Sequence, residues 1–270
     1  MTRFGTRLPP ALVTGGAGGI GAAIVRQLAD FGHRVAIGYS RGSSRAETLA
    51  AELEAAGGEA MAVHCDVSDR AIVDAAFCAI EQRWEAPLVL VNCGGVRHVG
   101  SLARFSPDQW DEILSINLTG PFNAMQRALP AMRHTQWGRV VNISSPAGRV
   151  PYVGGAGYGA SKAGLNHLTR VAALELSRFN ITVNCVSPGL VRTDMTETMG
   201  EDGLAAALSG QAHPRLVEPA EVASLVSFLV TDEAQMVNGQ DIAVDGGGEA
   251  LGKGPSREVQ STTDAQGSGP

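Results

Sequence analysis

Residues 11–21, with the sequence ALVTGGAGGIG, give the clearest indication of the fold. It opens with an apolar run, and its glycines give the spacing G-x-G-x-x-G at Gly16, Gly18 and Gly21. Apolar residues then recur at helical spacing as far as Phe31. We therefore expect a strand, a tight turn and a helix, in which the glycines let the backbone approach a pyrophosphate at the helix N-terminus. A tight turn without a ligand is the alternative interpretation.

Strand-like and helix-like stretches alternate along the rest of the chain. Short apolar runs predict further strands at 35–37, 60–65, 88–92, 140–144, 181–186 and 242–245. Helical patterns cover 45–56, 68–84, about 107–134 with a bend near Gly120, 157–178 and 219–229. The alternation predicts an α/β fold, a single doubly wound Rossmann-type domain whose seven-stranded parallel sheet has helices on both faces. We expect this domain over 1–248, with a substrate lid at about 190–215 and a disordered tail at 249–270.

Composition excludes several classes of protein. The 270 residues carry a formal charge of −6, with a pI of about 5.5. This balance argues against nucleic acid or an anionic membrane as a partner, and no apolar run approaches the about 20 residues of a membrane span. The four cysteines lie far apart without a C-x-x-C pattern, so the sequence shows no metal or redox motif. We expect them to be small buried residues of a cytoplasmic protein.

A second stretch carries the candidate chemistry. Tyr158 and Lys162 lie four residues apart in the predicted helix at 157–178, so their side chains share a face. An ammonium near a phenol favours the phenolate, so Lys162 is expected to lower the pKa of Tyr158 and allow proton transfer near neutral pH. Ser145 is placed to donate a hydrogen bond to the same substrate oxygen. The chain has only two lysines and three tyrosines, which makes a chance pairing uncommon. A solvated helix face is the alternative.

Residues 38–45 follow the second predicted strand, where a site for NAD usually has an acid that binds the ribose 2′-hydroxyl. This segment has no acid, and it contains Arg41, Arg45 and the hydroxyl groups of residues such as Tyr39 and Ser40. Such a segment suits a 2′-phosphate and predicts NADP as the cofactor. An exposed basic loop without a ligand is the alternative.

From about residue 10 to residue 248 the chain resembles the short-chain dehydrogenase/reductase family, and within it the 3-oxoacyl-[acyl-carrier-protein] reductases. Motifs in the family's order and spacing carry the resemblance: the glycine turn at 14–21, Asp66-Val67, residues 92–95, Asn117, Ser145, Tyr158, Lys162 and Pro188-Gly189. Two departures stand out. Cys93-Gly94 replaces the usual Asn-Ala, and Gln136 and Phe179 stand where carrier-protein reductases commonly have arginines near the active-site entrance. Arg133 and Arg178 lie beside these two positions.

The resemblance implies a catalytic set of Asn117, Ser145, Tyr158 and Lys162. Tyr158 would be the acid/base, and Ser145 would position the substrate carbonyl. Asn117 would hold a water in a proton relay that runs to Lys162. Lys162 would also bind the nicotinamide ribose and lower the pKa of Tyr158.

The resemblance also implies a cofactor site. Asp66 would bind the adenine amino group with Val67 beside the ring, and Thr193 would meet the nicotinamide amide. The full cofactor-binding set implied is Thr14, Gly15, Gly19, Ile20, Gly21, Tyr39, Ser40, Arg41, Asp66, Val67, Asn92, Gly94, Tyr158, Lys162, Pro188, Gly189, Val191 and Thr193.

The activity that the resemblance implies is the NADPH-dependent reduction of a ketone to a secondary alcohol by a homotetramer. The first substrate to expect is a 3-oxoacyl thioester on acyl carrier protein. A ketoreductase of a polyketide or other secondary-metabolite pathway fits the same motifs. A regulator that binds NADP without catalysis is the alternative from another class, and such a protein would be expected to have lost Tyr158 or Lys162.

Overall fold

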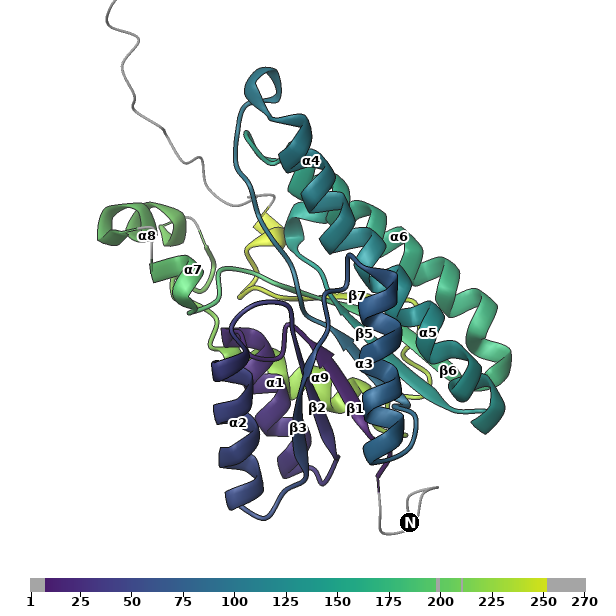
Figure 1. Cartoon of the computed structure of the whole chain (residues 1–270). Helices are drawn as coiled ribbons and strands as arrows, with labels where there is room; N and C mark the ends of the chain where they lie inside the picture. Colours follow the sequence, from purple (N-terminus) through teal and green to yellow (C-terminus); the bar gives the residue numbers. More distant parts are fainter. Residues whose placement is uncertain (1–7, 198–199, 210, 252–270) are drawn as a thin grey trace, which may run out of the picture.

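The computed structural model describes residues 8–197, 200–209 and 211–251. A parallel sheet lies at its centre, with seven strands in the order β3-β2-β1-β4-β5-β6-β7 (Figure 1). The strands are β1 (Ala11–Thr14), β2 (Val35–Tyr39), β3 (Ala60–His64), β4 (Val89–Asn92), β5 (Gly138–Ile143), β6 (Ile181–Pro188) and β7 (Asp241–Val244). The predicted fold class is confirmed. The strand order reverses between β1 and β4, and ligands of such sheets bind beyond the C-terminal strand ends at this place.

Helices cover both faces of the sheet. In Figure 1, α1, α2 and α9 lie on one face, and α3, α5 and α6 lie on the other. The helices are α1 (Gly19–Asp30), α2 (Ser43–Ala55), α3 (Arg70–Arg83), α4 (Pro107–Leu114), α5 (Gly120–Thr135), α6 (Ala156–Leu176), α7 (Asp194–Glu197), α8 (Gly200–Leu208) and α9 (Pro219–Leu229). Short 3-10 segments lie at η1 (Leu102–Arg104), η3 (Pro146–Gly148), η4 (Ser177–Phe179) and η5 (Glu249–Leu251).

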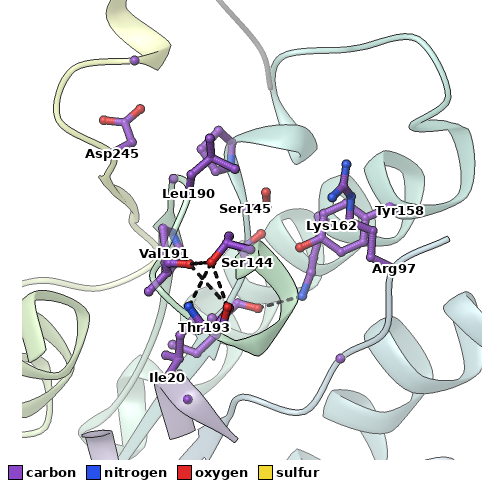
Figure 2. Close-up of a pocket in the computed structure, with 18 of the residues that line it drawn as sticks. Ile20, Arg97, Ser144, Ser145, Tyr158, Lys162, Leu190, Val191, Thr193 and Asp245 are labelled. Atoms are coloured by element: carbon purple, nitrogen blue, oxygen red, sulfur yellow. Dashed lines mark hydrogen bonds between the residues drawn. The ribbon is translucent and has the colours of Figure 1, made fainter. Parts of the chain in front are cut away.

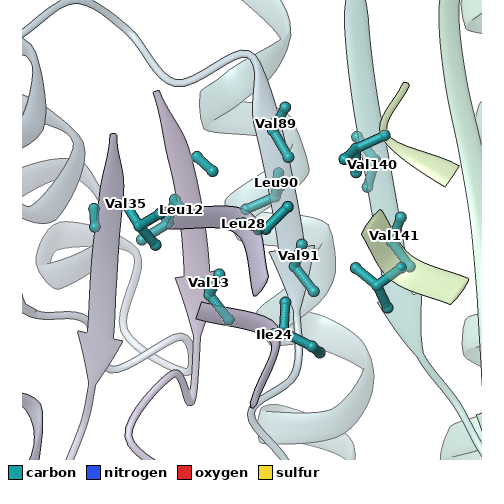
Figure 3. Close-up of a cluster of buried hydrophobic side chains, with 14 of the residues drawn as sticks. Leu12, Val13, Ile24, Leu28, Val35, Val89, Leu90, Val91, Val140 and Val141 are labelled. Atoms are coloured by element: carbon teal, nitrogen blue, oxygen red, sulfur yellow. The ribbon is translucent and has the colours of Figure 1, made fainter. Parts of the chain in front are cut away.

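The core lies between the central strands and these helices. Leu12 and Val13 of β1 and Ile24 and Leu28 of α1 belong to this core, and all four side chains are fully buried (Figure 3). Central strands are apolar along their whole length because helices cover both of their faces. Burial of each such side chain contributes about 1.5–3 kcal/mol relative to exposure.

The structure differs from the sequence-based expectation in two places. The helical pattern over 107–134 is broken by a π-helical turn, η2 (Ser115–Thr119), which lies before the expected bend at Gly120 and contains Asn117. Within the predicted tail, Glu249–Leu251 form the ordered segment η5, and residues 252–270 lie outside the described residues.

The predicted lid region contains α7 and α8, which stand out from the body of the domain beside α2 (Figure 1). Among the described residues, no helix is both long enough and apolar enough to cross a membrane.

Candidate active site

The site is built on the C-terminal ends of the central strands. Parallel pairing places Thr14 of β1 beside Asn92 of β4, Asn92 beside Asn142 of β5, and Asn142 beside Cys185 of β6. The Nδ2 of Asn92 donates to Oδ1 of Asn142 at 2.8 Å, and the Nδ2 of Asn142 donates to Oγ1 of Thr169 at 2.8 Å. These buried hydrogen bonds fix the strand ends and the α6 helix, which carries Thr169, relative to one another.

The glycine turn packs directly against the loop after β4. Gly15 has a φ of +64°, and a Cβ atom added to it would lie 2.6 Å from the Cα of Gly94. The Oγ1 of Thr14 accepts hydrogen bonds from the backbone N–H groups of Cys93, at 3.2 Å, and Gly94, at 3.4 Å. A side chain at position 15 would separate these two loops, so the close approach explains the glycine there.

A large cavity of about 1010 Å³ opens beyond these strand ends (Figure 2). Its wall joins the glycine turn, the end of β5, the start of α6 and the segment after β6. The predicted residues that line it are Gly19, Ile20, Gly21, Ser145, Tyr158, Lys162, Pro188, Gly189, Val191 and Thr193. Four segments that are far apart in the sequence thus meet in one space.

A second cavity of about 310 Å³ adjoins the first, since Gly18, Arg45, Gly95 and Val96 line both. The predicted residues that line it are Gly15, Tyr39, Ser40, Arg41, Asp66, Val67 and Gly94. The Oγ of Ser40 donates to Asp66 at 2.9 Å. The hydrogen bond from Ser68 is the largest cause that lowers the pKa of Asp66, so its carboxyl is held as the anion.

Tyr158 and Lys162 both project from the first turns of α6 into the large cavity (Figure 2). The Nζ of Lys162 lies 5.6 Å from the centre of the Tyr158 ring and donates to the carbonyl oxygen of Ile143 at 2.8 Å. Ser145 comes from the loop after β5, and its hydroxyl is close enough to the Tyr158 phenol to lower the pKa of that group. The three side chains therefore form one cluster on one wall.

The electrostatics of this cluster correct one expectation. Burial raises the pKa of Tyr158, and the two effects that lower it come from the hydrogen bond with Ser145 and from the charge of Arg97, rather than from Lys162. Burial also lowers the pKa of Lys162 to about 8. The amine therefore loses its proton below the pH range in which the phenol titrates, so it carries no charge there that could lower the pKa of Tyr158.

Asn117 and Asn92 lie behind the cavity walls and hold them in place. The side chain of Asn117 accepts from the backbone N–H of Val96 and donates to the carbonyl oxygen of Val96, both at 2.9 Å, and it also donates to Ser161. This pairing fastens the π-helical turn to the loop after β4. Thr14 has a similar supporting role through Cys93 and Gly94.

Sequence reasoning missed several cavity residues. Cys93, Arg97, Ser144, Tyr152, Val153, Leu190, Gln211, Asp245 and Glu249 also line the large cavity. Burial raises the pKa of Cys93 to about 12, so its thiol is neutral beside Lys162. Cys93 was visible as a departure within a matching motif, whereas the other positions carry no local pattern that marks them.

The two adjoining cavities fit a dinucleotide. Gly18 and Gly19 present no side chain at the mouth of the large cavity and lie at the N-terminus of α1, where backbone N–H groups are available for a pyrophosphate. The small cavity contains Asp66 and the basic side chains of Arg41 and Arg45, as a phosphorylated adenosine requires. Tyr158 and Lys162 stand at the other end, where a nicotinamide would meet a substrate.

Comparison with known proteins agrees with this geometry. The family model described as "short chain dehydrogenase" matches residues 10–203. The chain is 37% identical over 237 residues to the 3-oxoacyl-[acyl-carrier-protein] reductase FabG of Staphylococcus aureus (strain Mu50 / ATCC 700699), which covers 88% of this chain and 96% of that protein. It is 39% identical over 236 residues to the reductase MabA of Mycobacterium bovis, with 87% and 91% covered.

Two solved structures have the same fold. A gluconate 5-dehydrogenase from Burkholderia cenocepacia J2315, in complex with NADP and tartrate, superposes with a TM-score of 0.86 at 29% identity and covers 92% of this chain and 98% of its own. A blue fluorescent protein from a metagenomic library, in complex with NADPH, gives 0.84 at 37% identity, with 89% and 98% covered. The family model and the similar sequences show that the chain belongs to the short chain dehydrogenase family of oxidoreductases, and the geometry of the cavities and of the Tyr158–Lys162 pair agrees with this.

Proposed function

We propose that this protein uses NADPH to reduce the ketone of a 3-oxoacyl thioester to a secondary alcohol. The observation that carries the proposal is the meeting of Ser145, Tyr158 and Lys162 in one cavity with the glycine turn. The similar proteins named 3-oxoacyl-[acyl-carrier-protein] reductases, and the similar structures with NADP and NADPH, support the substrate and the cofactor.

The residues divide the chemistry between them. Bound NADPH supplies a hydride to the ketone carbon. Ser145 donates a hydrogen bond to the ketone oxygen and holds it beside the Tyr158 hydroxyl, which donates the proton that completes the alcohol. The raised pKa of Tyr158 keeps the phenol protonated before the reaction, as a proton donor requires. Lys162 orients the nicotinamide ribose, and a proton returns to Tyr158 along a relay that runs from a water held by Asn117 to Lys162.

The basic wall of the small cavity supports NADP over NAD. Arg45 forms a 3.2 Å ion pair with Asp194 of α7, and Arg41 lies 3.9 Å from Glu112. Both pairs are largely exposed, so each arginine can exchange its partner for a phosphate at low cost. Arg45 lines both cavities and contacts the α7 segment, so the proposed lid and the phosphate site are adjacent.

An acyl carrier protein is the proposed partner, and two arginines lie beside the positions where carrier-protein reductases commonly have them. Arg133 and Arg178 flank the ring of Phe179, at 4.6 and 4.7 Å from its centre. Tyr158 is in the first turn of α6 and Arg178 follows its last turn, so the two lie roughly 30 Å apart along the helix. The two arginines therefore lie far from the Tyr158 of their own chain.

Assembly follows from the outer helices. Trp110, Phe122, Val171 and Leu174 on α4, α5 and α6 are large apolar side chains that are 37%, 40%, 37% and 81% exposed. Exposed apolar groups on adjacent helices favour pairing with a second copy, and we propose a homotetramer. The free thiols of Cys65 and Cys185 in the core fit a reducing compartment such as the cytoplasm.

A substrate panel tests the function. NADPH consumption is measured with acetoacetyl carrier protein, with its short thioester mimic and with polycyclic ketones. We expect the two acetoacetyl thioesters to be reduced with the higher kcat/KM. Turnover of polycyclic ketones alone would contradict the 3-oxoacyl assignment and favour a ketoreductase of secondary metabolism.

A further inference from the structure

Arg97 lies in the wall of the large cavity, in the loop that follows β4. Its backbone is fixed from both sides. The preceding residue, Val96, is clamped through its N–H and its carbonyl by the side chain of Asn117, both at 2.9 Å. The following residue, His98, is hydrogen-bonded through Nε2 to Glu112 at 2.7 Å. The position of Arg97 in the wall is therefore set before any substrate binds.

The side chain of Arg97 is braced by an aromatic ring. Its guanidinium carbon lies 5.8 Å from the centre of the Tyr152 ring, and its Nε donates to the Tyr152 hydroxyl at 3.5 Å. The ring is itself held from behind, because a Cβ atom added to Gly155 would lie 2.5 Å from Cε1 of Tyr152. A braced guanidinium loses less conformational freedom when it binds a ligand than an unsupported one.

Arg97 belongs to the substrate half of the cavity. Figure 2 shows it on the same side as Tyr158 and Lys162, across from Val191 and Thr193. Its charge is close enough to Tyr158 to lower the pKa of the phenol. A ketone held by Tyr158 would therefore lie against the cavity wall that also carries this guanidinium.

We propose that Arg97 binds the C1 oxygen of a 1,3-dicarbonyl substrate while Tyr158 and Ser145 hold the C3 ketone oxygen. The inference rests on the proposed function and adds to it the residue that selects the substrate. A guanidinium donates several N–H groups in one plane, which suits a carbonyl or carboxylate oxygen. A 3-oxoacyl thioester and a free 3-oxo acid share this C1 oxygen, and a simple ketone lacks it.

The test compares Arg97→Met with wild type on matched substrates. These are the N-acetylcysteamine thioester of 3-oxohexanoate, free 3-oxohexanoate, and 3-hexanone, which has the ketone without the C1 oxygen. Losing a hydrogen bond from a charged donor should lower kcat/KM for the two dicarbonyl substrates about 10- to 100-fold more than for 3-hexanone. Any effect of Arg97 on the Tyr158 pKa is common to all substrates and cancels in this ratio. The dicarbonyl substrate whose kcat/KM falls more shows whether Arg97 binds the C1 oxygen of a thioester or of a carboxylate.

Two further variants and a binding measurement check this result. Arg97→Lys keeps the charge near Tyr158 and loses the planar fork, so it should recover only part of the discrimination. Arg104→Met removes an exposed arginine of η1 and serves as the matched control, with no change in the ratio. In a Tyr158→Phe background, calorimetric titration with the thioester should show a Kd that Arg97→Met raises about 10- to 100-fold.

The outcomes separate the two proposals. Equal losses for the thioester and for 3-hexanone, with no change in Kd, would overturn the role of Arg97 and leave the proposed function standing. A wild-type enzyme that does not reduce the thioester would overturn the proposed function and this inference with it.

Discussion

The Nδ2 of Asn166 donates a 2.6 Å hydrogen bond to Oδ2 of Asp241 and so joins α6, the helix of Tyr158, to the start of β7. Asp241 also accepts from Oγ of Ser187 at 2.5 Å and forms an ion pair with Arg149. Arg149 in turn is paired with Glu249 of η5. This network lies under the loop that carries Ser145, and its centre is an almost fully buried carboxylate.

We predict that Asp241→Asn lowers the free energy of unfolding by about 3 kcal/mol, because it leaves part of a buried ion pair unmatched. Urea denaturation at neutral pH measures the change. Glu54→Gln is the control, since Glu54 pairs with Arg83 at the surface and should cost at most about 1 kcal/mol. If the two substitutions lowered the free energy of unfolding equally, the buried Asp241 ion pair would contribute no more to stability than an exposed one.

We predict that Tyr158→Phe lowers kcat by about 10²- to 10⁴-fold, the usual contribution of a positioned acid or base. The change removes one oxygen from the cavity and leaves the glycine turn intact, so the Kd for NADPH should stay close to that of wild type. Fluorescence of bound NADPH measures the affinity. Turnover like that of wild type would rule out Tyr158 as the proton donor.

Lys162 should make the protein less stable at neutral pH than it would be with an apolar residue there. Burial lowers its pKa from 10.5 to about 8. Below pH 8 the charged amine therefore lowers the free energy of unfolding. This loss of stability disappears as the pH rises towards 10.5. Lys162→Met is therefore expected to raise the unfolding free energy at pH 7 by up to about 3 kcal/mol while abolishing activity.

The pH dependence gives the check on this prediction. Above pH 8 the folded wild type loses the proton that the unfolded chain still binds, so its stability rises and the gap to Lys162→Met narrows. Chemical denaturation of both proteins at pH 7, 8, 9 and 10 follows the gap. A gap that stays constant over this range would mean that Lys162 keeps an ordinary pKa in the fold.

Cofactor preference should depend on the basic wall of the small cavity. A charged hydrogen bond contributes about 1.5–3 kcal/mol, so one such contact from Arg41 or Arg45 gives about 10- to 100-fold preference for NADPH over NADH. Arg41→Ala and Arg45→Ala should reduce the ratio of kcat/KM values by lowering the value for NADPH. Arg26→Ala, on the exposed side of α1 and paired with Glu52, is the control. If neither substitution changes the preference for NADPH over NADH, other residues bind the 2′-phosphate.

Assembly should depend on the outer face of α6. Leu174 is 81% exposed in the single chain, and Leu174→Asp would place a charge at the proposed contact. We expect light scattering to show a smaller species than wild type at micromolar concentration. Phe31→Asp, at the end of α1 and 53% exposed, should leave the assembly unchanged. A wild type that is monomeric would contradict the prediction.

Local patterns were enough to predict the fold and part of the site. The glycine turn after β1 and the Tyr158–Lys162 spacing are short-range features, so each could be recognised within a few residues of sequence. The break at Asn117 was expected at Gly120, because a π-helical turn has no residue signature as clear as glycine followed by proline. The predicted roles of the site residues remain predictions.

The sequence by itself determined the alternation of strands and helices, and through it the parallel sheet with its ligand site at the strand ends. Only the tertiary structure decided the electrostatics of that site. The pKa of Tyr158 is set by burial, by Ser145 and by Arg97, which lies 61 residues before it in the chain. Arg149 likewise pairs with Asp241 and Glu249, which lie 92 and 100 residues further along the chain. Periodicity reports which face of an element is buried, whereas the field at one atom depends on which distant charges the packing brings beside it.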